Sequence, residues 1–367
     1  AAVDAGLKPS VASAIAKYHM TEMSRTVLNA AMDIHGGRAI QMGPRNYLAT
    51  PYMGIPIGIT VEGANILTRN LIIFGQGAVR CHPYVYQEMQ LANSENNRKT
   101  LKAFDKILCQ HIGYGISNAV RTLVMGLGGV HGLRSPARDV TAKYYRQLRR
   151  MSAAFALVSD VAMLTLGGAL KRKERLSARL GDVLSHLYMA SAALKYYQQN
   201  GCLDEEKPYL EWSVRTCLYR TEEALLDFFN NLPQRGLGRV LRSFVFPWGP
   251  RYKLPKDKLS QQLIDAMLQP GALRDRLTQD CYIGDKPSDP LYRLEHALQC
   301  VNDAAPLMLR VKQAVRHKQL PPVRDEEHLL TMARDKAILS EAEYQSALLA
   351  KQAVLEAVKV DEFDEMP

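Results

Sequence analysis

Helical periodicity is the feature that most constrains the fold of this chain. Over most of the 367 residues, apolar side chains recur at three- and four-residue intervals, and the repeats stop at glycines or prolines. We find no stretch of alternating apolar and polar residues of the kind that marks a half-buried strand. The sequence therefore predicts an all-α protein.

Composition and charge limit the classes of partner. The six cysteines are widely spaced and include no Cys-x-x-Cys, which argues against a structural zinc site or a disulfide framework and suits a reducing compartment. The nine histidines do not cluster with ligand spacing, so no metal site is predicted. The net charge of +10 favours an acidic partner: nucleic acid, an anionic membrane surface or a phosphate-bearing ligand.

The first predicted helix covers residues 9–35 and ends at Gly36 and Gly37. Pro9 suits its first turn, and glycine supplies the left-handed residue with which helices often end. Paired glycines also let backbone N–H groups approach a phosphate. The pair is thus either a plain helix end or a phosphate contact.

Glu62 is the only carboxylate between Ile55 and Gly77. The preceding residues 41–59 are predicted to form a loop, and an amphipathic helix is predicted after Glu62, its apolar face carrying Ile66, Leu67, Asn70, Leu71 and Phe74. Apolar neighbours raise the pKa of a carboxylate and make it a better base, whereas a helix N-terminus stabilises the anion. A glutamate that merely suits the helix dipole is the alternative. For Arg69, a structural salt bridge is favoured over a ligand contact.

Residues 81–97 are the predicted linker, because they are polar and contain His82-Pro83. Further helices are predicted at 101–125, 136–170, 175–199 and 209–230, followed by shorter ones. Ser340 is expected to cap the last helix in a capping box, and the acidic tail at 361–365 is expected to be disordered.

Two surface patterns each have two interpretations. Basic residues cluster at 143–150 and 171–175, as on a solvated helix face, and too few aromatic residues accompany them to predict nucleic-acid binding. Residues 235–248 place arginines opposite an aliphatic and aromatic face. That pattern suits a helix lying in a membrane interface or, with somewhat more weight, a helix packed on a core.

Three motifs resemble a known family. Val61-Glu62-Gly63-Ala64-Asn65, with Arg69, resembles the Tyr-Glu-Gly-Thr-Asn-Gln…Arg motif of the acyl-CoA dehydrogenases. Asp4-Ala5-Gly6 and Ala16-Lys17 precede it, and Asp33-Ile34-His35-Gly36-Gly37-Arg38 is similar to the Gln-x-x-Gly-Gly or His-Gly-Gly element of the family. The remaining chain resembles the C-terminal helical extension of the large bacterial fatty acyl-coenzyme A dehydrogenases.

The resemblance implies three segments: the end of the family's C-terminal helical bundle (1–80), a linker (81–97) and a second, accessory helical domain (98–367). It implies that Glu62 is the catalytic base for oxidation of fatty acyl-CoA to trans-2-enoyl-CoA with FAD, the first step of fatty acid β-oxidation. Gly36 and Gly37 would contact the FAD pyrophosphate, often that of a neighbouring subunit in a homodimer. Electron-transfer flavoprotein is the implied electron acceptor, and a cytoplasmic location, peripheral at the inner membrane, is expected.

The chain also departs from the family pattern. Ala64 and Ile66 replace the usual Thr and Gln near the flavin, so no flavin role is assigned to their side chains. The first residues look like the end of a secondary-structure element that begins earlier. We therefore expect the chain to be a fragment of a longer protein and to be inactive alone. There are two alternatives to the dehydrogenase function. The protein could be an oxidase, or the chain could be a non-catalytic helical module for membrane attachment or partner binding. No nucleic-acid partner is expected.

Overall fold

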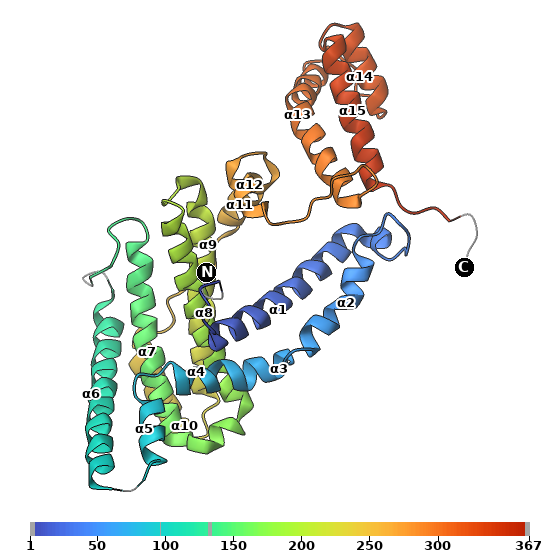
Figure 1. Ribbon diagram of the computed structural model, residues 1–367. Helices are drawn as coiled ribbons and strands as arrows, with labels where there is room; N and C mark the ends of the chain where they lie inside the picture. Colours follow the sequence, from blue (N-terminus) through green and yellow to red (C-terminus); the bar gives the residue numbers. More distant parts are fainter. Residues whose placement is uncertain (1–3, 96, 131–133, 364–367) are drawn as a thin grey trace. The chain divides into compact units, whose positions relative to one another are not determined.

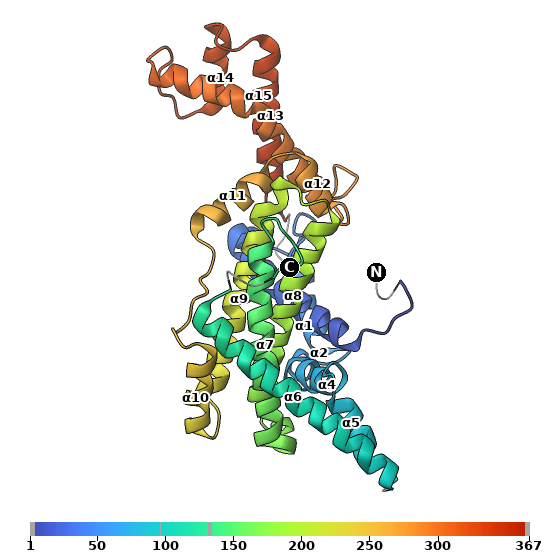
Figure 2. The same ribbon diagram turned by 90° about the vertical axis from the view of Figure 1, so that its left-hand side faces the viewer.

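Every regular element in the described residues is a helix. The computed structural model describes residues 4–95, 97–130 and 134–363, and helices account for all the regular structure within them (Figures 1 and 2). The all-α prediction is therefore confirmed. The chain forms two compact units, which are described separately: unit 1 holds the residues up to Met23 with Ile57–Leu263, and unit 2 holds Ser24–Pro56 with the residues from Ile264 onward.

Unit 1 is built on four long helices that follow one another and pack in sequence. These are α6 (Arg98–Gly128), α7 (Ala142–Leu166), α8 (Glu174–Gln199) and α9 (Lys207–Asn230), and each packs against the one before it (Figures 1 and 2). The facing apolar stripes of α7, α8 and α9 form most of the core, where Leu180, Val214 and Phe228 are fully buried. The predictions of helices at 175–199 and 209–230 match α8 and α9 closely, because long amphipathic patterns leave little ambiguity.

Helix α10 (Arg235–Val245) closes this core. Leu241 and Val245 on its apolar side are buried, and Phe246 follows them into the same core. Gly238 lets α10 approach the end of α9, since a Cβ atom there would lie only 2.2 Å from the carbonyl oxygen of Phe229. Of the two interpretations of residues 235–248, the structure thus shows the helix packed on a core.

Five further helical segments carry the motifs of the N-terminal part. Helix α1 (Ser10–His35) is the predicted long helix and ends where Gly36 adopts a φ of +56°. Helix α3 (Asn65–Leu67), the π-helical segment η2 (Thr68–Ile73), helix α4 (Phe74–Arg80) and helix α5 (Val85–Ala92) follow later in the chain. The wide π turn changes which side chains face inward. Asn70 and Phe74 are buried as predicted, but Ile66 and Leu67 are exposed.

Two predicted irregular segments contain helices, so those predictions are wrong in part. Residues predicted as a loop form helix α2 (Ala49–Thr60), whose start is capped by Asn46: its Oδ1 accepts the N–H groups of Leu48 and Ala49 at 2.9 and 3.0 Å. Pro51 fits the first turn and Pro56 removes one helical hydrogen bond, so two prolines do not prevent the helix. Helix α5 likewise lies inside the predicted linker. The division at 81–97 itself stays a prediction.

Unit 2 centres on a helical hairpin and a third helix. Helix α15 (Glu341–Val358) packs against α13 (Pro290–Arg316) and α14 (Glu326–Asp335), while α11 (Asp257–Leu268) and α12 (Ala272–Thr278) come earlier in the chain. The capping box of Ser340 and Glu343 is confirmed. The disorder predicted for the acidic tail is wrong at Asp361, which is buried and accepts the backbone N–H of Arg45 at 2.9 Å. Residues 364 and 365 lie outside the described residues.

Candidate functional site

Glu62 lies in the tight turn between α2 and α3. Its φ of +52° places it in the left-handed region, and Gly63 follows with a φ of +90°. A residue with a Cβ atom rarely adopts this conformation unless its surroundings hold it there. The turn projects the Glu62 side chain from the protein, where it is exposed.

Helix α1 holds this turn through a buried polar cluster. Lys17 Nζ donates to the carbonyl oxygen of Gly63 at 2.8 Å and to Oδ1 of Asn65 at 2.7 Å. Asn65 is 4% exposed, and its Nδ2 donates to Thr21 Oγ1 at 2.9 Å and to Glu22 Oε1 at 2.7 Å. Because buried polar groups are costly to leave unpaired, these bonds fix the backbone directly after Glu62.

The surface near Glu62 in sequence is apolar and exposed. Ile57 is 63% exposed, Val61 48%, Ile66 70% and Leu67 45%. This part of the chain therefore does not remove the carboxylate from water by itself. If another protein surface covered these side chains, it would bury them and would also remove water from Glu62.

Arg69 has the structural role that the sequence favoured. Its Nε donates to Asp182 Oδ1 at 2.8 Å and its second terminal nitrogen donates to Oδ2 at 2.5 Å. The hydrogen bond to Asp182 raises the pKa of Arg69 further, so the guanidinium stays charged. This two-point pairing ties η2 to α8. It is reinforced by Gly181, where a Cβ atom would lie 3.0 Å from the carbonyl oxygen of Arg69.

Gly37 lines a pocket of unit 2, and Gly36 directly precedes it. They begin the short 3₁₀ turn η1 (Gly36–Ala39), and a Cβ atom at either would meet no atom within 4 Å. The pocket has a volume of about 980 Å³ and is lined by His35, Gly37 and Arg38 together with apolar side chains. Arg38 is only 9% exposed, yet its buried Nε has no hydrogen-bond partner among the residues that the structure describes. A buried cationic donor without a partner fits an anionic group.

His35 is locked beside this turn. One ring nitrogen, Nδ1, lies 2.9 Å from the carbonyl oxygen of Ala31, and the other, Nε2, lies 2.9 Å from the hydroxyl of Tyr47. Burial raises the pKa of Tyr47, so its hydroxyl keeps its proton and donates to Nε2. Nδ1 therefore carries the hydrogen that faces Ala31. The fixed ring sets where α1 ends and η1 begins.

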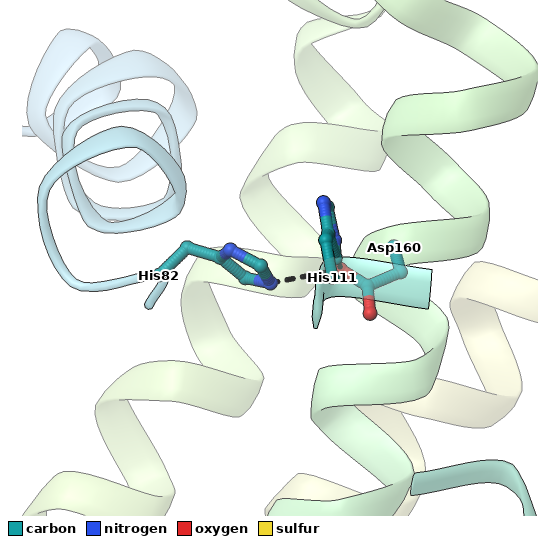
Figure 3. A group of neighbouring side chains, drawn as sticks. All are labelled: His82, His111 and Asp160. Atoms are coloured by element: carbon teal, nitrogen blue, oxygen red, sulfur yellow. Dashed lines mark hydrogen bonds and ion pairs between the residues drawn. The ribbon is translucent and has the colours of Figure 1, made fainter. Parts of the chain in front are cut away.

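The structure also gathers residues that the sequence did not connect. His82, His111 and Asp160 place one ligand-type atom each within 4.8 Å of one another (Figure 3). Nε2 of His82 lies 3.0 Å from Asp160 Oδ1, although the contact is not aligned as a hydrogen bond, and Nε2 of His111 lies 3.4 Å from the same oxygen. The other nitrogen of His111 lies 2.8 Å from Glu88.

The hydrogen positions favour a polar network over a metal site. Nδ1 of His82 accepts the backbone N–H groups of Tyr84 and Val85, each at 3.2 Å, so Nε2 carries the hydrogen that faces Asp160. A metal ligand needs a free lone pair at that nitrogen. The cluster ties α5, α6 and α7 together. In the sequence, the only sign of this cluster was that its polar residues interrupt mostly apolar stretches.

Two family models match the chain. Residues 1–75 match the model described as "Acyl-CoA dehydrogenase, C-terminal domain", and residues 79–363 match the one described as "Acyl-CoA dehydrogenase, C-terminal, bacterial type". The first match contains Glu62, Gly36 and Gly37, and the second contains the four-helix core of unit 1. No solved structure matches the chain at a significant level.

Proposed function

Because the chain belongs to the acyl-CoA dehydrogenase family, we propose that it supplies the catalytic base for α,β-dehydrogenation of a fatty acyl-CoA to trans-2-enoyl-CoA. This is the first step of fatty acid β-oxidation. The observation that carries the proposal is the placement of Glu62: a carboxylate on a turn fixed by Lys17 and Asn65, flanked in the sequence by exposed apolar side chains.

In this mechanism, Glu62 accepts the proton from the carbon next to the thioester carbonyl. The hydride from the neighbouring carbon is accepted by the flavin when it is bound. The fixed turn keeps the carboxylate in place, and the apolar surface excludes water once it is covered, which favours proton transfer. We infer that the cover comes from parts of the enzyme outside these 367 residues, so the chain alone is inactive.

Gly36, Gly37 and Arg38 fit the phosphate part of FAD. The two glycines leave space over their backbone, and the cationic side chain of Arg38 lines the same pocket as Gly37. We infer that these residues contact the pyrophosphate of a flavin held by a neighbouring subunit in a homodimer. Ala64 and Ile66 receive no flavin role. Electron-transfer flavoprotein is the proposed acceptor, and the proposed location is cytoplasmic.

Steady-state turnover tests the assignment of Glu62. In the full-length enzyme, replacing Glu62 with Gln should lower kcat with a long-chain acyl-CoA by about 10²–10⁴-fold, the usual contribution of a general base. The affinity for acyl-CoA should change little, because Gln keeps the size and polarity of the side chain. Glu95→Gln, in the exposed segment between α5 and α6, is the control and should leave kcat unchanged. Retained turnover in Glu62→Gln would exclude Glu62 as the base.

A second candidate function, membrane attachment, is favoured by the orientation of α6. Its inner face is polar, since Asn118 and Thr122 are buried, and its outer face is apolar. The outer stripe consists of exposed residues spaced four apart: Leu108, Ile112, Ile116, Val120 and Val124.

The charges at the start of α6 suit an anionic bilayer surface. Exposed Lys99, Lys102 and Lys106 outnumber the single carboxylate Asp105 there. An apolar stripe beside lysines is typical of a helix that lies in a membrane interface.

Among the described residues, Ala142–Lys171 is also long and apolar enough to cross a membrane, but α7 packs between α6 and α8. We propose peripheral contact through α6.

A further inference from the structure

We propose that unit 1 contains a binding site for a single-chain anionic amphiphile, such as a free fatty acid, separate from the Glu62 turn. The site is a pocket of about 610 Å³ bounded by α4, the end of α7, the 3₁₀ turn η3 (Gly167–Lys171) and the start of α8. Its volume falls within the roughly 300–1,000 Å³ typical of small-ligand sites. No residue of the Glu62 turn lines it.

The walls of this pocket suit an aliphatic chain. Aliphatic and aromatic side chains from four elements form most of its lining: Leu71, Phe74, Ala78, Val79, Met163 and Leu170. Phe74 and Leu170 belong to the buried core, so the floor of the pocket is part of the rigid helical bundle. An apolar chain that entered it would leave water for a preformed apolar surface.

The charges at the pocket select an anionic head group. Among the described residues that line it, the charged ones are Arg80 and Lys171, with no carboxylate, and both cations are exposed. A terminal amine would therefore meet only like charges, whereas a carboxylate or phosphate would meet two cations. A ligand with one anionic head group and one apolar chain would therefore match both the two cations and the apolar walls of the pocket.

Two glycines leave room that no protein atom fills. Gly75 and Gly167 line the pocket, and a Cβ atom at either would meet no atom within 4 Å. Gly75 lies within α4, where glycine is less favourable than residues with a side chain. Because a Cβ atom fits at position 75 and the residue lines the pocket, a larger side chain there is expected to occupy the pocket, which makes it the informative position to change.

The first experiment measures oleate binding by displacement of a fluorescent fatty acid from the protein carrying the whole sequence. Wild type should show saturable one-site binding, and Gly75→Leu should weaken it at least about tenfold, a change of about 1.4 kcal/mol. Gly113→Leu is the matched control. It changes a helical glycine on α6 that also has no atom within 4 Å, and it should bind oleate as wild type does.

The second experiment tests the head group. Arg80→Gln combined with Lys171→Gln should weaken oleate binding about tenfold and leave binding of oleyl alcohol unchanged. Comparing oleate with a lysophosphatidate of the same chain assigns the head as carboxylate or phosphate, according to which binds more tightly.

A wild-type measurement guards against variants that fail to fold. Oleate should slow amide hydrogen exchange in α4 and η3 but not in α6. The proposal would be overturned by absent saturable binding, by oleyl alcohol binding as tightly as oleate in wild type, or by unchanged binding in a folded Gly75→Leu variant. None of these readouts depends on turnover or on Glu62, so their failure leaves the proposed dehydrogenase function untouched.

Discussion

At the scale of single residues, the position of Glu62 depends on one partly buried amine, that of Lys17. Lys17 lies 46 positions before Gly63 in the sequence and donates to its carbonyl oxygen, so α1 and the Glu62 turn are coupled through the side chain of Lys17. From the sequence, Lys17 and Gly63 could be singled out only through the resemblance to the acyl-CoA dehydrogenases. Spacing cannot show a lysine that reaches a backbone carbonyl on another element, because the contact depends on how α1 lies over the turn.

Lys17→Met should therefore loosen the turn. The carbonyl of Gly63 and Oδ1 of Asn65 would lose their charged donor, at a cost of about 2 kcal/mol in the free energy of unfolding. Amide exchange should accelerate at residues 61–65 more than in α8. Lys8→Met, at an exposed lysine before α1, should change neither quantity. Equal exchange rates in wild type and Lys17→Met would contradict the role given to this amine.

His186 should make stability depend on pH. Burial, with a smaller effect from neighbouring His19, lowers its pKa from 6.5 to about 3 in the folded protein. The unfolded chain therefore binds this proton first, so the contribution of His186 is complete above pH 6.5 and is lost as the pH falls toward 3. Between pH 7 and 5 the loss is about 2 kcal/mol.

Denaturant unfolding at pH 7, 6 and 5 measures this dependence. His186→Asn should flatten the profile relative to wild type, because it removes the imidazole with the strongly lowered pKa and leaves only the dependence that neighbouring His19 contributes, whose pKa burial also lowers. Parallel profiles for the two proteins would show that the buried imidazole does not control stability in this range.

At the scale of elements, the helices that sequence predicted best are those with long, regular apolar faces. Helices α1, α8 and α9 lie close to their predicted bounds, while α2 was predicted as a loop because prolines and glycines, among them Pro51 and Gly54, interrupt its segment. The π turn in η2 escaped prediction because it changes the direction of side chains without changing the sequence period. Packing against α8 through Gly181 and Arg69 sets that turn.

Close packing of α10 on α9 gives a test at this scale. Gly238→Ala should destabilise the protein by about 2 kcal/mol or more, because the new Cβ atom would lie 2.2 Å from the carbonyl oxygen of Phe229. Gly236→Ala on the same helix is the matched control. Its Cβ atom would meet nothing within 4 Å, so alanine should be neutral or stabilising. Thermal unfolding of both variants measures the difference, and equal melting temperatures would contradict the packing argument.

At the scale of the whole molecule, the family and the all-α class could be predicted from sequence, whereas the sites that need distant residues could not. His111 and Asp160 are 49 positions apart and meet only because α6 packs on α7. The outward apolar face of α6 was also missed, since amphipathicity does not show which face turns inward. The sequence drew attention instead to α10, which buries its apolar side.

Vesicle binding tests the proposed contact of α6 with membranes. Ile112→Glu should lower partitioning to anionic vesicles at least about tenfold, because it removes a large apolar contact and adds a repelled charge. Gln110→Glu adds the same charge at an exposed polar position of the same helix and should have a smaller effect. Equal losses in the two variants would mean that charge alone governs binding.

The central claim, that Glu62 is the base, is tested most directly by single-turnover reduction of the flavin. The full-length enzyme with FAD is mixed with a long-chain acyl-CoA without oxygen, and the flavin absorbance is followed for wild type and Glu62→Gln. The account predicts bleaching in wild type and none in Glu62→Gln, although the variant still binds FAD and acyl-CoA. Equal bleaching in both proteins would contradict it and move the base to another residue.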